Sequence, residues 1–348
     1  MTGRVVTVGE TMLLLTGGDV GAVPDLDHMR VGTGGAESNV AIGLVRAGVP
    51  ATWVGRVGTD PAGERVVRDV RGEGVDVVAV PDGERSTGLM MKERLADGRT
   101  RVTYHRRGSA GSALTAGDVP HGLVERAALV HLTGITLALS DSAREAVESV
   151  LDRAARAGVP VSFDVNHRPK LIDRQAAREV YARVAARSSI VFAGDDEARL
   201  VLGRAEDDGD DETLAHELAA RSGGRAVVKL GSRGAVASID GAFLRRPATP
   251  VRVVDPVGAG DAFVAGWLAA SLLGLPAATA LDRAADAGAL ACTVEGDWRR
   301  PDPDALRRPE GTQDATARHH PGAPDPAGTA DPATPSDTDP AVHDRVDR

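Results

Sequence analysis

Asp255-Pro-Val-Gly258-Ala259-Gly260-Asp261 lies between the apolar run 251–254 and the helix-like run 262–273. A β-branched strand, a glycine-rich turn and a helix in this order gather backbone N–H groups and the positive end of a helix dipole around one small pocket. Such a pocket suits an anion. A carboxylate at its mouth, Asp261, would be placed to take a proton from a hydroxyl that attacks a phosphoryl group held by those amides. The alternative is an ordinary connection whose glycines only satisfy a tight turn.

Around this stretch, short apolar runs alternate with helix-like runs along most of the chain. Strands are expected at 5–8, 52–57, 75–80, 129–132, 161–165, 190–193 and 226–230. Helices are expected at 40–47, 63–72, 140–158, 174–187, 197–203, 212–222 and 276–294. This alternation predicts an α/β domain with a doubly wound, mainly parallel sheet flanked by helices.

Two hairpin signals interrupt the alternation. Extended runs at 86–94 and 99–106 are joined through Ala96-Asp97-Gly98, and runs at 235–239 and 242–245 flank Asp240-Gly241. Asp-Gly between extended runs is a strong hairpin signal. Since an antiparallel hairpin does not easily join a parallel sheet, we expect the first one to form a small β lid with the extended segment 10–16. The lid then comes from about 10–34 and 86–107, and 17–31 is expected to be irregular.

Composition narrows the class of protein. The chain has 348 residues, a formal charge of −9 and no basic stripe interleaved with aromatic residues, which argues against a nucleic-acid partner or an anionic membrane. The N-terminal residues contain no apolar leader and no run of 18 apolar residues occurs, so we expect a cytoplasmic protein. The lone Cys292 excludes an internal disulfide and a cysteine metal cluster.

The last forty residues differ from the rest. Residues 309–348 contain seven prolines and no Leu, Ile, Phe, Met, Trp or Tyr. A segment of this composition cannot bury enough apolar surface to offset its ordering entropy. We therefore predict a folded domain over residues 1–308 and a disordered tail over 309–348.

Three glycine-containing motifs occur in a characteristic order. Gly34-Gly35-Ala-Glu-Ser-Asn39 precedes a helix-like run, Lys229-Leu-Gly231-Ser-Arg-Gly234 follows a strand, and Gly258-Ala-Gly260-Asp261 comes near the end. The chain lacks the G-x-x-x-x-G-K-[ST] loop and the protein-kinase signatures. This arrangement resembles the ribokinase-like (PfkB) carbohydrate kinases over roughly residues 4–305.

The resemblance implies a phosphotransferase that uses ATP and Mg²⁺, with the sugar bound between lid and sheet and Asp261 as the general base. The residues it implies for ATP are Asn166, Lys229, Gly231, Gly234, Gly258, Ala259 and Gly260. It also places Asp255 in a region that often holds a monovalent cation. We further expect that a β-branched residue at Gly260 would crowd the pocket or be excluded by the backbone conformation.

Within the family, the chain is similar to the kinases of 2-keto-3-deoxygluconate. This resemblance implies sugar-acid contacts from Gly34, Gly35, Tyr104, Arg106, Arg168 and Asp297. In an extended strand, residues 104 and 106 point to the same face, so a hydroxyl and a guanidinium would meet the substrate together. Arginine suits a carboxylate because it can bind both oxygens. A kinase of a neutral ketose such as fructose, or a non-catalytic sugar-binding or nucleotide-binding regulator, is the alternative.

The chain departs from the family pattern at Gly194-Asp-Asp-Glu197, where an Asn usually stands first. Glu197 is retained, and we expect it to assist with magnesium. The lid carries Leu89-Met90 where the 2-keto-3-deoxygluconate kinases often have an aromatic residue, and Met90 is expected to pack within the lid. Exposed sheet edges commonly pair, so a homo-oligomer formed through the lid is expected.

Overall fold

The larger sheet of the computed structural model, which describes residues 3–95, 100–205 and 208–298, has nine strands. Their order is β13-β12-β11-β10-β9-β8-β1-β4-β5. The strands are β1 Val5–Val8, β4 Ala51–Gly58, β5 Asp76–Asp82, β8 Leu129–Thr133, β9 Val161–Asp164, β10 Ile190–Gly194, β11 Arg225–Lys229, β12 Ala235–Ile239 and β13 Ala242–Arg246. All neighbours are parallel except for the antiparallel pairs that β12 makes with β11 and β13.

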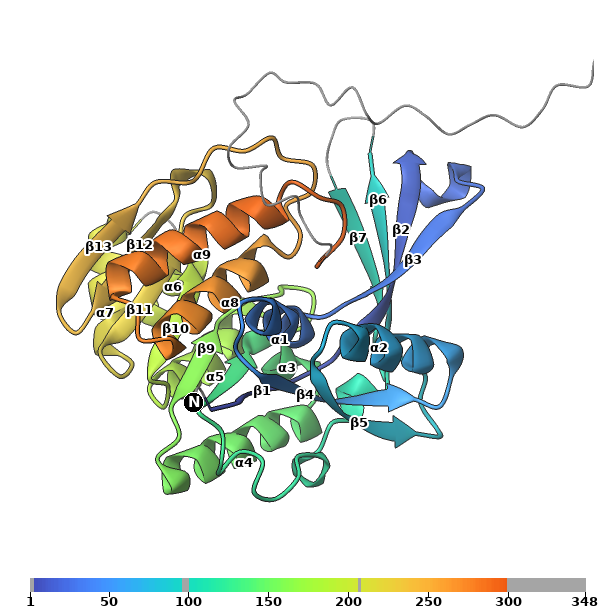
Figure 1. Ribbon diagram of the computed structural model, residues 1–348, viewed down its shortest axis with the longest axis horizontal. Coiled ribbons are helices and arrows are strands. Elements are labelled where there is room, and N and C mark those ends of the chain that lie inside the picture. The colour runs from blue at the N-terminus through green and yellow to red at the C-terminus, as the bar shows by residue number, and fades with distance from the viewer. Residues whose placement is uncertain (1–2, 96–99, 206–207, 299–348) are drawn as a thin grey trace, which may run out of the picture. The chain divides into compact units, whose positions relative to one another are not determined.

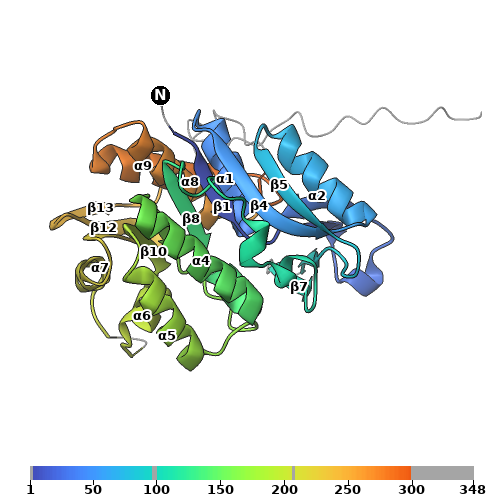
Figure 2. The ribbon, with the colours of Figure 1, turned by 90° about the horizontal axis from the view of Figure 1, so that it is seen from below.

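Helices cover both faces of this sheet (Figures 1 and 2). One face carries α1 Ala36–Arg46, α2 Pro61–Gly72, α8 Ala259–Leu272 and α9 Ala277–Ala291. The other carries α3 Gly134–Leu139, α4 Asp141–Ala157, α5 Arg174–Ala185, α6 Asp195–Leu202 and α7 Asp211–Ala220. Because the central strands are covered on both sides, they are uninterrupted apolar runs such as Ile190-Val-Phe-Ala193.

A second sheet of four strands projects from the larger one (Figure 1). Its order is β3-β2-β6-β7, from Met29–Gly34, Met12–Val20, Leu89–Arg94 and Thr100–His105. The predicted hairpin appears as the antiparallel pair β6 and β7, while β2 and β6 are parallel. The prediction of a doubly wound, mainly parallel sheet with a small additional β-sheet is therefore confirmed.

Three local predictions are wrong. The run 251–254 forms no strand, because the backbone amides of Val254 and Asp255 donate to Cys292 O instead of to a sheet edge, and Val253 is 60% exposed. Strand β3 begins at Met29 and strand β2 continues to Val20, so both enter the stretch 17–31 that was expected to be irregular. Arg30 and two glycines give β3 a weak strand pattern, and its pairing with β2 stabilises it. The short helix α3 was also missed.

Helix α4 shows how local signals set the elements. Ser140 is its N-cap and its Oγ accepts a hydrogen bond from the amide of Ala143 at 3.1 Å, while Gly158 ends the helix in the left-handed region with φ 68°. Val147, Val150 and Leu151 recur at helical spacing and are fully buried. Capping and periodicity together explain why this helix was predictable to within one residue at either end.

The predicted end of the folded domain at 308 and the tail 309–348 lie outside the described residues. In the part of the chain that is described, no helix is long and apolar enough to cross a membrane.

The turn that leads into hairpin β12–β13 requires glycine. Gly234 has φ +97°, and a Cβ there would lie 2.1 Å from Arg246 O and 2.6 Å from the amide of Ala248. In the hairpin turn, Gly241 also has a positive φ of +87°, but a Cβ there would meet nothing within 4 Å. The two glycines thus share a positive φ and differ in the space around them, and Gly234, with ψ −133°, also lies outside the left-handed helical region.

We predict that Gly234→Ala lowers the free energy of unfolding well beyond the roughly 1–2 kcal/mol expected for a left-handed alanine alone. Gly241→Ala is the matched control, and its loss should stay within that range because the space is open. Urea unfolding of both variants measures the difference. Equal losses would show that the close approach to Arg246 O does not contribute.

Candidate active site

The site lies at the carboxyl ends of the parallel strands, next to β1, where the strand order reverses. A cavity of about 330 Å³ opens there between the larger sheet, the N-terminus of α8 and the small sheet. Of the sequence-predicted site residues, it is lined by Gly35, Tyr104, Arg106, Asn166, Arg168, Lys229, Gly258, Gly260, Asp261 and Asp297. Residues as far apart in the sequence as Gly35 and Asp297 thus line one cavity.

The glycine-rich turn forms the expected helix N-terminus. Gly258 is the N-cap of α8 with φ +82°, and the first helical residues are Ala259, Gly260 and Asp261. The expectation for Gly260 is wrong in its backbone argument, because the left-handed residue is Gly258. A Cβ at Gly260 would meet only Lys229 Nζ, at 3.7 Å. The turn nevertheless leaves the first amides of α8 without helical partners at the cavity.

Asp261 lies in the first turn of α8 with its carboxylate in a crowded polar setting. Burial raises its pKa, the hydrogen bond from Asn39 lowers it, and the nearby carboxylates of Asp164 and Asp297 raise it, so that the pKa of Asp261 is about 7. Arg168 lowers it slightly. A carboxylate with this pKa is half ionised near neutrality, which matches the requirement for a general base.

Asn39 holds the carboxylate of Asp261 in place. Its Nδ2 donates to Asp261 Oδ2 at 2.8 Å and lies 3.4 Å from Asp297 Oδ2. On the other side, Asn166 Nδ2 lies 3.5 Å from Asp261 Oδ1, and Asn166 has a positive φ of 40° that Asn tolerates better than most residues. Asn39 belongs to the Gly34–Asn39 motif, but nothing in the sequence indicated its partner.

Lys229 is paired with Asp164 at the end of β9. Its Nζ donates to the two carboxylate oxygens at 2.7 and 2.9 Å. Burial lowers the pKa of Lys229, but the carboxylates of Asp164 and Glu197 raise it more, so the pKa is raised overall. The ammonium is therefore charged and fixed at the cavity wall, where it can interact with an anionic ligand.

Arg106 is already paired. Its Nε and Nη2 donate to Glu10 Oε2 at 2.8 and 2.5 Å, and Glu10 also accepts a hydrogen bond from Ser109. The guanidinium lies 5.7 Å from the ring centre of Tyr104, as the strand alternation predicted for one shared face. Sequence reasoning missed Glu10, which stands 96 positions away from Arg106.

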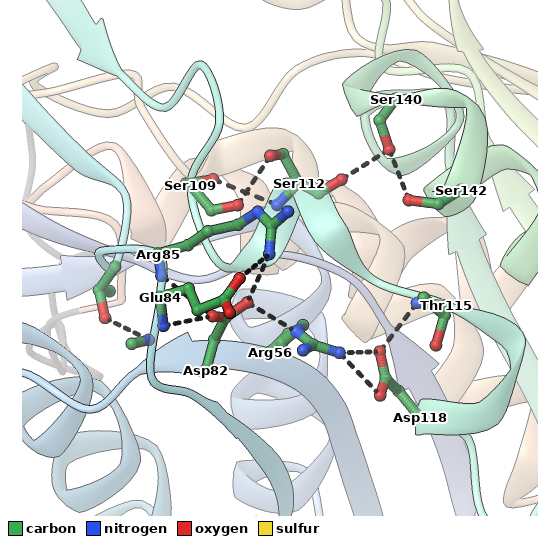
Figure 3. A network of polar contacts seen from close by, with 12 residues as sticks. Arg56, Asp82, Glu84, Arg85, Ser109, Ser112, Thr115, Asp118, Ser140 and Ser142 are labelled. Carbon is green, nitrogen blue, oxygen red and sulfur yellow. Dashed lines mark hydrogen bonds and ion pairs between the residues drawn. The ribbon is translucent and has the colours of Figure 1, made fainter.

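A network of polar contacts supports the segment that carries Ser109 (Figure 3). Ser112 Oγ donates to Ser109 O at 2.7 Å, and Ser140 Oγ donates to Ser112 O at 2.6 Å. Beside it, Arg56 binds Asp82 at 3.0 Å and Asp118 at 3.1 Å (Figure 3). The chain that leaves β7 is thus tied to α4 and to the larger sheet, which fixes Ser109 and the Glu10 carboxylate.

Arg168 differs from Arg106. Among the described residues its hydrogen bond is to the carbonyl of His167, at 3.1 Å, and it carries no ion pair there. Its guanidinium lines the cavity and affects the pKa of both Asp261 and Asp297. Of the two predicted arginines, Arg168 therefore has more donors left for a ligand.

Asp297 lies in the cavity wall, close to the backbone of Gly34 and Gly258. A Cβ at Gly34 would lie 2.3 Å from Asp297 Oδ2, and a Cβ at Gly258 would lie 2.3 Å from Asp297 O. Burial raises the pKa of Asp297, and its Oδ1 has no hydrogen-bond partner among the described residues. A buried carboxylate oxygen without a partner is a natural acceptor for a substrate hydroxyl.

The remaining predicted residues lie off the cavity lining. These are Gly34, Gly231, Gly234, Ala259, Glu197 and Asp255. Glu197 caps α6: its Oε2 accepts from Gly194 N and its Oε1 from His167 N, both at 2.7 Å. The described residues contain no cluster of three His, Cys, Asp or Glu that could hold a metal ion by themselves.

Comparison with known proteins gives the same reading as the geometry. The sequence profile of the pfkB family of carbohydrate kinases matches residues 2–303, and the chain belongs to this family. It is therefore a sugar kinase, a phosphotransferase with an alcohol group as acceptor, and the resemblance read from the motifs is confirmed.

Several relatives are similar over most of their length. The chain is 34% identical to the 2-dehydro-3-deoxygalactonokinase of Haloferax volcanii, over 88% of this chain and 96% of the relative. It is 37% identical to the 2-dehydro-3-deoxygluconokinase of Thermoproteus tenax, over 84% and 89%. The crystal structure of the 2-dehydro-3-deoxygluconokinase of Thermotoga maritima superposes with a TM-score of 0.81 at 26% identity, covering 88% of this chain and 98% of that one.

The raised pKa of Asp261 has a consequence for stability. The folded protein binds a proton at Asp261 more tightly than the unfolded chain does, so stability falls as pH rises from about 4 to about 7 and stays at the lower level above that. We predict that Asp261→Asn stabilises the protein, and that its gain in Tm over the wild type is larger at pH 8 than at pH 5.

Asp240→Asn is the control for this measurement. Its hydrogen bond and ion pair with Arg225 lower the pKa of Asp240, so it stays ionised from pH 5 to pH 8. Thermal unfolding at the two pH values should therefore give a constant difference from the wild type. A Tm shift for Asp261→Asn that is equally independent of pH would contradict the raised pKa.

Proposed function

We propose that the protein uses ATP to phosphorylate the terminal hydroxyl of 2-keto-3-deoxy-D-gluconate, giving the 6-phosphate. The observation that supports this most is the position of Asp261, whose pKa of about 7 suits a base, on the same cavity as two arginines. The names of the relatives described above support a 2-keto-3-deoxy sugar acid as substrate. They do not separate the gluconate from its galactonate epimer.

In this proposal Asp261 accepts the proton of the sugar hydroxyl as its oxygen attacks the γ-phosphorus. The bond from that phosphorus to the β,γ-bridging oxygen breaks, and ADP leaves. The amides of Gly260 and Asp261 in the first turn of α8 and the ammonium of Lys229 stabilise charge on the transferred group. Asn39 keeps the Asp261 carboxylate oriented during proton transfer, since it is the short hydrogen-bond donor to it.

The phosphates of ATP would lie along Gly258, Ala259 and Gly260, with Asn166 and Lys229 beside them. The open space at Gly260 fits such a group. Magnesium bound with the nucleotide would neutralise phosphate charge and would need only one or two carboxylates from the protein. Glu197 would have to give up a backbone hydrogen bond to serve as one of them, because both of its oxygens are engaged.

The substrate carboxylate would be bound mainly by Arg168. Arg106 would contribute through its Nη1, because its Nε and Nη2 donate to Glu10. Tyr104 and Asp297 would bind sugar hydroxyls, and Gly34 and Gly35 would let the sugar approach the backbone. The pairing of Arg106 with Glu10 is also the observation that favours the alternative, a neutral ketose such as fructose, because it neutralises one of the two guanidinium groups.

Loss of the base should separate chemistry from binding. We predict that Asp261→Asn lowers kcat by about 10²–10⁴, the usual range for a general base, and changes the affinities for ATP and sugar by less than about tenfold. In the wild type, kcat/KM should fall as pH drops below about 7, because Asp261 becomes protonated. Steady-state rates and calorimetric titration with a non-hydrolysable ATP analogue test both points. Retention of a tenth of the wild-type turnover would refute the assignment of the base.

Substrate class is tested at Arg168. We predict that Arg168→Ala lowers kcat/KM for the sugar acid. The fall should correspond to a loss of about 2–3 kcal/mol of transition-state stabilisation, as expected for a charged hydrogen bond. A neutral sugar that reacts at all should lose much less. Coupled ADP-release assays over 2-keto-3-deoxygluconate, its galactonate epimer, fructose and ribose give the comparison. Equal losses on acid and neutral sugars would favour the neutral-ketose alternative.

We also propose that two copies associate through the small sheet. Val20 of β2 and Val31 of β3 are 56% and 48% exposed, and burial of such apolar surface stabilises association. Light scattering after gel filtration should give a mass of about two chains. Val31→Glu should reduce that mass to one chain if β3 lies in the interface.

A further inference from the structure

Asp255 is a buried carboxylate that holds three parts of the site together. It is 3% exposed and lies just before the turn that begins at Gly258. Its Oδ1 accepts from the amide of Val257 at 3.2 Å, and its Oδ2 accepts from the amide of Gly296 at 3.0 Å. The third partner is the ammonium of Lys92, which donates to Oδ2.

Lys92 comes from the small sheet, 163 positions earlier in the chain. It lies in β6, two residues after Met90, so both side chains point to the face that lines the cavity. It is only 4% exposed. A buried lysine that reaches from β6 to Asp255 connects the small sheet with the turn that would hold the phosphates.

The surroundings of Asp255 do not fit the monovalent cation that the family resemblance suggested for this region. The carboxylate already has one full positive charge and two amide donors. A second cation bound to the same carboxylate would lie next to the ammonium of Lys92, and like charges at such separation repel strongly in a buried site. The charge that a metal ion would supply is therefore supplied by the chain itself.

We infer that Lys92 is a positioning residue for phosphoryl transfer: its ammonium is the built-in counter-ion of Asp255, it sets the turn 255–258, and it makes the reaction independent of K⁺. The inference rests on the kinase activity of the family and not on which sugar acid is the substrate. Lys92 acts through Asp255 and Val257, whose amide leads directly into the turn.

A second lid cation allows a matched comparison. Arg94 stands two residues after Lys92 on the same strand, and its Nη2 pairs with Glu295 Oε1 at 2.9 Å, one residue before Gly296. It therefore ties the small sheet to the same segment without touching Asp255. If mere attachment of the sheet were the role of Lys92, loss of Arg94 would have a similar effect.

The first experiment uses the wild-type protein. Initial rates with ATP, Mg²⁺ and the sugar that reacts fastest are measured in K⁺, Na⁺ and tetramethylammonium chloride at equal ionic strength. We expect the three rates to agree within about twofold, since the charge at Asp255 is already balanced. A severalfold activation by K⁺ over tetramethylammonium would overturn the inference, whichever sugar acid is the substrate.

The second experiment compares Lys92→Met with Arg94→Met. We expect Lys92→Met to lower kcat and raise the KM for ATP, together by about 10- to 100-fold, because a small misplacement of the phosphate-holding amides is costly. The KM for the sugar should change by less than about threefold, and Arg94→Met should stay within twofold of wild type on every constant. A loss confined to the sugar KM would overturn the inference, because Lys92 would then be a substrate ligand.

A double variant keeps the test decisive if Lys92→Met folds poorly. Lys92→Met with Asp255→Asn replaces the charged pair by a neutral one, so no buried charge is left unpaired. We expect the double variant to be no less active than the worse of the two single variants. Losses that simply multiply would show that Lys92 and Asp255 act independently, and would overturn the inference.

Discussion

Four aspartate carboxylates, buried or half-buried at the carboxyl end of one sheet, are the constraint on which the rest of the site depends. Asp164, Asp255, Asp261 and Asp297 lie at or next to one cavity, and each must be compensated because a buried unpaired charge is costly. Lys229 compensates Asp164 and Lys92 compensates Asp255. Asp261 and Asp297 have no ion pair among the described residues: Asn39 donates to Asp261 and lies near Asp297, Asn166 lies 3.5 Å from Asp261, and the pKa of both carboxyl groups is raised. Lysines thus neutralise Asp164 and Asp255, whose roles are structural, whereas Asp261, the candidate base, has no such partner among the described residues.

The use of lysine in this chain follows from the same constraint. The 41 basic residues include only three lysines, and two of them form these buried pairs while Lys170 is exposed. A compact ammonium on a flexible stem fits beside a single carboxylate in little space, whereas the guanidinium fork of Arg106 binds the buried Glu10 through two of its nitrogens. In a chain this rich in arginine, each lysine in the site marks a place where a point charge is needed.

The small sheet contributes more than a cover. Through Met90, Tyr104 and Arg106 it supplies a wall of the cavity, and through Lys92 it contacts the turn before α8. Arg106 in turn depends on Glu10, which lies just after β1 of the larger sheet, and on Ser109. Side chains of the cavity wall are therefore fixed by contacts that cross between the two sheets, so movement of the small sheet would alter the cavity and the turn before α8 together.

Local pattern determined the fold class, the order of strands and helices, and the turn from Gly258 to Asp261, because periodicity, caps and glycine positions are properties of neighbouring residues. Part of the cavity lining was also predictable, since motifs that end parallel strands meet at one edge of the sheet. The tertiary structure alone decided the partners: Asn39 with Asp261, Glu10 with Arg106 and Lys92 with Asp255 are separated by 222, 96 and 163 positions. It also decided that 251–254 stays out of the sheet and that β3 joins one. Charge compensation and strand pairing depend on which segments the fold brings together, and no spacing along the chain carries that information.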